Sequence, residues 1–74
     1  MADTIQTWTI EKRGGRYVAM AWSARVADGP VEVRLCDDLA AAQALVEQAS
    51  GRKLDWREAR GDELKHGVVC ATDL

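Results

Sequence analysis

The chain has 74 residues, enough for one hydrophobic core, so we expect a single small domain over residues 1–74. Apolar residues make up 47% of the chain and charged residues 30%, a composition that excludes an intrinsically disordered protein. Ten basic and twelve acidic side chains leave a net charge of −2. The basic excess with which nucleic-acid-binding proteins neutralise phosphates is missing, so nucleic acid is a disfavoured partner.

The chain shows neither a secretory signal nor a membrane-spanning segment. No basic flank followed by an apolar core is present at its start, and no apolar run approaches the roughly 18 residues that span a bilayer. Cys36 and Cys70 are too few for the disulfide framework of a small secreted domain. We therefore expect free thiols, a cytoplasmic location and no membrane partner.

Residues 5–12 and 16–26 alternate between apolar and polar side chains, which predicts two strands of a hairpin. Two registers are possible. A two-residue loop, Gly14 and Gly15, would divide the large apolar side chains between the two faces of the hairpin. A three-residue loop, Arg13 to Gly15, would gather them on one face, and because one face can then supply the core we predict this register. The face would carry Trp8, Ile10, Val18, Met20 and Trp22.

A turn at residues 28–30 and a third strand over residues 31–36 come next, with Val31, Val33 and Leu35 predicted to point inward. Asp37 or Asp38 is placed to cap a helix over residues 39–49, which Gly51 would end in the left-handed conformation. The helix has an apolar stripe at helical spacing. Its members are Leu39, Ala42, Leu45, Val46 and Ala49.

Residues 53–59 predict a fourth strand, with Leu54 and Trp56 on one face. Residues 62–66 are compatible with a helical turn closed by Gly67 or with the start of a strand; we favour the turn, or a loop, before a short last strand. The fold class is therefore α+β: a small antiparallel sheet in the order β-β-β-α-β(-β), with one helix packed across one face. The three tryptophans are expected to share that single core.

No catalytic constellation is visible, so we expect no enzymatic activity, no cofactor and no metal site. His66 lies four residues before Cys70 and the two could form a nucleophile pair, but an exposed histidine and a buried structural cysteine are favoured. A structural zinc site needs about four cysteine or histidine ligands, and the chain has three such residues in total.

Two surfaces remain as candidate binding sites. The predicted register leaves one sheet face open to an interaction partner, and its candidate residues are Thr7, Thr9, Tyr17, Ser23 and Arg25. The hairpin end forms a basic tip, with glycine amides that could approach a phosphate, made of Lys12, Arg13 and Arg16.

Three strands followed by a helix, from Trp8 to Ala49, resemble the small sheet domains that bind arm-type DNA sites in phage integrases. The alternating strands, glycine hairpin and alanine-rich helix also resemble the partial double-stranded-RNA-binding fold of some antitoxins. Both resemblances are architectural, and no functional residue is carried over because a fold does not decide function.

The leading hypothesis is a non-enzymatic interaction module that binds a protein partner or itself through the open sheet face or an unpaired strand edge. The alternative is a nucleic-acid-binding accessory protein that uses the basic tip.

Overall fold

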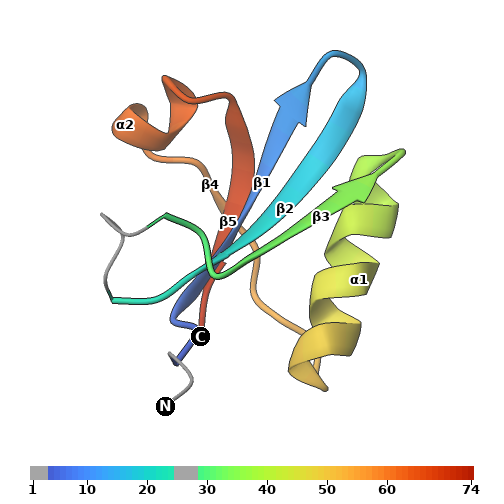
Figure 1. Cartoon of the computed structure of the whole chain (residues 1–74), viewed down its shortest axis with the longest axis vertical. Helices are drawn as coiled ribbons and strands as arrows, with labels where there is room; N and C mark the ends of the chain where they lie inside the picture. Colours follow the sequence, from blue (N-terminus) through green and yellow to red (C-terminus); the bar gives the residue numbers. More distant parts are fainter. Residues whose placement is uncertain (1–3, 25–28) are drawn as a thin grey trace.

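The computed structural model describes residues 4–24 and 29–74. The described chain contains β1 (Thr7–Arg13), β2 (Arg16–Trp22), β3 (Glu32–Cys36), α1 (Leu39–Ser50), β4 (Arg57–Glu58), α2 (Gly61–Leu64) and β5 (Val68–Asp73). The strands form one antiparallel sheet in the order β3-β2-β1-β5-β4, and α1 packs against one side of it (Figure 1). The predicted α+β fold with one helix on one face is confirmed. We call the side that α1 covers the helix face and the opposite side the outer face.

The β1–β2 hairpin closes through a two-residue turn. Arg13 pairs with Arg16, and both turn residues have positive φ, 53° at Gly14 and 81° at Gly15. Two consecutive residues in this region form the turn whose twist matches that of antiparallel strands, and glycine adopts it without a Cβ clash. The predicted three-residue loop is therefore wrong, because two adjacent glycines satisfy the tighter turn directly.

This register sends two kinds of residue to the helix face. Trp8 pairs with Ala21 and Ile10 with Ala19, and all four are almost completely buried. The small alanines leave room for α1 to approach the sheet, while the large side chains of β1 fill the space beside it. The helix-face core consists of Trp8, Ile10, Ala19, Ala21, Ala42, Val46 and Cys70.

The outer face carries apolar side chains of its own. Val18, Met20 and Val68 are each no more than 6% exposed and form a second apolar layer. Trp22 also belongs to this side, where its indole Nε1 donates a hydrogen bond to Thr9 Oγ1 at 2.8 Å. The expectation that three tryptophans share one core is therefore wrong, since Trp8 belongs to the helix-face core, Trp56 packs half-buried against it, and Trp22 lies on the other side of the sheet.

The inward orientation predicted for the third strand is also wrong. Val33 pairs with Met20 and Leu35 with Val18, so both side chains lie on the outer face. Side chains alternate along strands, so a hairpin register that moves Met20 away from the helix moves its β3 neighbours with it. Val31, Val33 and Leu35 are exposed.

The helix α1 begins at the predicted residue, Leu39, and ends at Ser50, one residue later than predicted. Asp38 is the N-cap, and its Oδ1 accepts a hydrogen bond from the Ala41 amide at 2.7 Å. Gly51 ends the helix at a φ of 76°. Along the predicted stripe, Ala42 and Val46 are buried, Leu39 and Leu45 are half-buried against the core, and Ala49 is exposed.

The C-terminal third differs from the prediction mainly in strand length. The fourth strand is reduced to Arg57–Glu58, while Leu54 and Trp56 pack against the core from an extended segment. The helical turn after it is confirmed as α2, and Gly67 follows with a φ of 83° before β5. The predicted strand end at Val26 and the turn residue Asp28 lie outside the described residues. No helix in the described part of the chain is long and apolar enough to cross a bilayer.

The observed register predicts that Ala19 cannot accept a larger side chain. Ala19→Leu should lower the free energy of unfolding by about 2 kcal/mol, because the added atoms must fit between β2 and α1. Leu35→Ala is the matched control and should change it by less than about 0.5 kcal/mol, since Leu35 is 67% exposed. Urea unfolding followed by tryptophan fluorescence measures both. A neutral Ala19→Leu would indicate that Ala19 faces solvent and would contradict the register.

Candidate functional site

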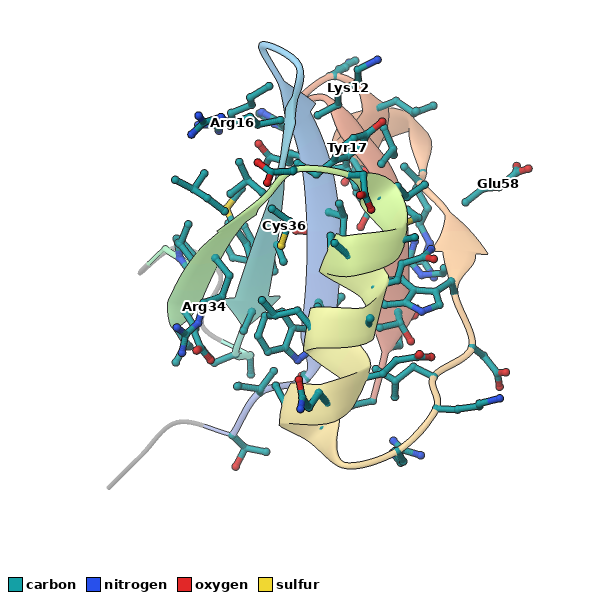
Figure 2. All side chains as sticks on the ribbon, turned by 90° about the vertical axis from the view of Figure 1, so that its right-hand side faces the viewer. Lys12, Arg16, Tyr17, Arg34, Cys36 and Glu58 are labelled. Carbon is teal, nitrogen blue, oxygen red and sulfur yellow. The ribbon has the colours of Figure 1, made fainter. Side chains whose placement is uncertain are left out.

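The structure divides the predicted interaction surface. Thr7 and Thr9 lie on the outer face. Ser23, just beyond β2, is buried and lines a hollow on that face, together with both threonines. Tyr17 lies on the helix face, opposite Cys36, and packs half-buried against the core (Figure 2). Arg25 lies outside the described residues. The surface is divided because the observed register places β1 threonines and β2 odd-numbered residues on opposite faces.

An open hollow of about 900 Å³ occupies the outer face. Val18, Met20 and Trp22 form its apolar floor. The charged side chains around it include nearly equal numbers of acidic and basic groups. The carboxylates belong to Glu11, Asp62, Glu63 and Asp73, and the guanidinium groups to Arg13, Arg57 and Arg60.

Arg57 organises one wall of this hollow. Its Nη1 lies 2.8 Å from Glu63 Oε1, and its Nε lies 2.9 Å from Asp73 Oδ2. Thr7 Oγ1 donates to Asp73 Oδ1 at 3.1 Å, so the network joins β4, α2, β5 and β1. The hydrogen bonds from Arg57 are the main reason that the pKa values of Glu63 and Asp73 are lowered and that of Arg57 is raised. The opposite charges of this network pair with one another, so its ion pairs and hydrogen bonds stabilise the sheet.

The basic tip is less basic than its sequence suggests. Arg13 Nη2 lies 2.8 Å from Glu11 Oε2, and Glu11 is only 4% exposed. Lys12 and Arg16 point to different sides of the hairpin end (Figure 2). Consecutive strand residues face opposite sides of a sheet, so the three cations do not form one continuous surface.

The structure separates the candidate nucleophile pair. Cys70 belongs to the helix-face core, where Gln43 Nε2 donates to its Sγ at 3.7 Å, whereas His66 lines the hollow on the outer face. Burial raises the pKa of the Cys70 thiol, which disfavours the reactive thiolate. Burial is also the main reason that the pKa of Cys36 is raised, and the charges of Asp37 and Asp38 add to it.

Within residues 4–24 and 29–74, no cluster of three or more histidine, cysteine, aspartate or glutamate side chains is arranged to hold a metal ion.

The feature that stands apart is the free edge of β3. Among the described residues this strand is at one end of the sheet and pairs only with β2. α1 lies in front of the sheet without covering that edge (Figure 2). Two apolar side chains lie on its outer face: Val33, which is 52% exposed, and Leu35, which is 67% exposed. Val31, just before the strand, is 45% exposed. The alternation of these residues is visible in the sequence, where it predicted side chains that point into the core. The feature of the sequence that could have placed these side chains on the surface is the pair Gly14 and Gly15. A two-residue turn there sets the register of β2 and, through it, the face on which Val33 and Leu35 lie.

The backbone of β3 is also available at this edge. The Val31 amide donates to Ala21 O at 2.7 Å, which shows that the carbonyl of Ala21 faces β3. Hydrogen-bonding residues alternate along antiparallel strands, so the residues of β3 that face β2 are those opposite Ala21, Ala19 and Tyr17. The intervening residues, Val33 and Leu35, direct their N–H and C=O groups away from the sheet.

Comparisons of the chain with protein-family models, with curated proteins and with solved structures gave no match.

The Arg57 network predicts a pH dependence of stability. The pKa values of Glu63 and Asp73 are lowered in the folded chain. Their ionised carboxylates therefore stabilise it at any pH above their ordinary pKa values of 4.5 and 3.8. This contribution is lost as the pH falls through the lower folded values. Arg57→Met should lower the free energy of unfolding by at most about 1 kcal/mol at neutral pH, and by less in acid, because the network is partly exposed. Urea unfolding at a series of pH values measures both chains, and Arg16→Met serves as the control. A difference that grows in acid would contradict the network.

The raised thiol pKa values predict slow alkylation. At neutral pH both cysteines should react with iodoacetamide at least about tenfold more slowly than an unstructured cysteine peptide, and the buried Cys70 should be the slower of the two. The rates should rise with pH as the thiols ionise. Mass spectrometry of the digested protein measures each site, and fast alkylation of Cys70 at neutral pH would show an activated thiol.

Proposed function

We propose that this chain is a protein-interaction module that receives an extended strand from a protein partner along the free edge of β3. In this mode of recognition, main-chain hydrogen bonds supply affinity and alternate side chains supply specificity. The observation that carries the proposal is the apolar stripe of Val33 and Leu35, which is exposed on the outer face of β3 beside backbone groups that point out of the sheet.

The contrast between the two sheet edges supports this assignment. Proteins protect edge strands by making them short or covering them, because an exposed apolar edge pairs with other chains. β4, at the other end of the sheet, is two residues long. β3 has five residues and an apolar side that continues the outer-face layer, since Val33 lies beside Met20 and Leu35 beside Val18. The exposed edge is therefore concentrated at β3.

We propose a binding role without enzymatic activity. We also propose a cytoplasmic location, which agrees with the two free thiols. The nucleic-acid alternative has less support, because Arg13 is already paired with Glu11 and the remaining tip cations diverge.

The proposed mode can be tested with a blocked, uncharged peptide in which valine alternates with threonine. Added to the ¹⁵N-labelled protein, it should shift the amide signals of Val33 and Leu35 most and slow their hydrogen exchange, because those N–H groups point out of the edge.

The double variant Val33→Thr/Leu35→Thr should weaken this peptide about tenfold through loss of two apolar cross-strand contacts. Val69→Thr is the matched control, because Val69 is an exposed valine on β5 away from this edge, and it should bind as the original chain does. No shift at Val33 and Leu35, or an equal loss in the control, would overturn the proposed mode.

A further inference from the structure

We propose that the strand received at this edge is β3 of a second copy of the same chain, paired antiparallel about a two-fold axis beside Val33. This inference rests on the proposed function and names its partner. The juxtaposition that carries it is the order of side chains at the middle of the edge: acidic Glu32, apolar Val33 and basic Arg34.

That order is complementary to itself when it is reversed. With Val33 opposite its own copy, Glu32 of each chain lies opposite Arg34 of the other. Opposite charges and apolar pairs directly across two antiparallel strands both stabilise the pairing. The two-fold axis repeats each cross-chain pair, as an isologous interface requires.

Neighbouring registers are less favourable. An axis beside Arg34 would place two guanidinium groups opposite each other, and an axis beside Glu32 would do the same with two carboxylates. Like charges in directly opposed positions destabilise a sheet. An axis beside Val33 also uses the backbone that is available, because the N–H and C=O of Val33 point out of the edge and can bond to the same groups of the copy.

The charges at this edge are already arranged for such pairing. Arg34 Nε donates to Glu32 Oε1 at 2.7 Å, and the two side chains are 57% and 32% exposed. They lie on the helix face of β3, opposite Ala19 and Ala21, whereas the apolar stripe lies on the outer face. Two copies would bring together two acidic and two basic groups in alternation, so no net charge is buried.

The resulting assembly is one continuous sheet of both copies, with the two α1 helices on one side and the two hollows on the other. The contact involves a single five-residue strand from each chain, which places it among small, transient interfaces. We therefore expect a dimer that forms with rising concentration.

Charge reversal provides the test. Sedimentation of the purified chain up to about millimolar concentration should show dimers. Glu32→Arg and Arg34→Glu should each weaken dimerisation at least about tenfold, because each places like charges opposite one another at two positions. An equimolar mixture of the two variants should recover the original association, since each Arg of one chain then faces a Glu of the other. The double variant E32R/R34E should dimerise as the original chain does.

The mixture of the two single variants serves as the internal control, because mixing cannot repair a misfolded chain. Circular dichroism and tryptophan fluorescence check that each variant is folded. Unchanged dimers of the single variants, or no recovery on mixing, would overturn the inference. A chain that stays monomeric while the valine–threonine peptide still protects Val33 and Leu35 would overturn the second copy as partner and leave strand addition standing. Failure of both peptide and second copy to bind would overturn the proposed function as well.

Discussion

The two-residue turn at Gly14 and Gly15 determines which side of the sheet each residue of β1 and β2 faces. A strand alternates its side chains strictly, so one residue more or less in the turn would exchange the two faces of one strand relative to the other. With the tight turn, alanines of β2 meet α1 while Trp8 and Ile10 fill the space beside them. The close approach of helix and sheet depends on this pairing.

The same constraint gives the sheet a second apolar side. Met20 and Val18 cannot reach α1, so they lie on the outer face with Trp22, above which the hollow opens. Ion pairs of Arg57 with Glu63 and Asp73 tie the C-terminal elements to one wall of this hollow. Apolar residues on both faces allow a small domain to bury more of its surface than one sheet face and one helix would. The outer layer continues to β3, where nothing in the described chain covers it.

The proposed function follows from where that layer ends. β5 returns to pair with β1, which leaves β3 as the outermost strand on the side of β2. The helix follows β3 directly but crosses the other face, so it covers neither the outer side of Val33 and Leu35 nor their outward backbone groups. An apolar stripe, unpaired backbone and paired opposite charges therefore occur on one short strand, and together they define a surface suited to another strand.

The order of strands and helix along the sequence was sufficient to predict the fold class. A cap at Asp37 or Asp38, the Gly51 exit and a turn or loop before Gly67 were also predicted, because each depends on a few adjacent residues. Local chemistry could not establish whether the residues of the basic tip, or those of the candidate interaction surface that includes Thr9 and Tyr17, lie together. Whether Glu11 neutralises Arg13, and whether Tyr17 and Thr9 share a face, depends on pairing between strands. The alternation of Val31, Val33 and Leu35 was plain in the sequence, yet alternation alone does not say which face is covered. Only the tertiary structure decided that, because α1 can occupy one side of the sheet and the glycine turn selects which residues it meets.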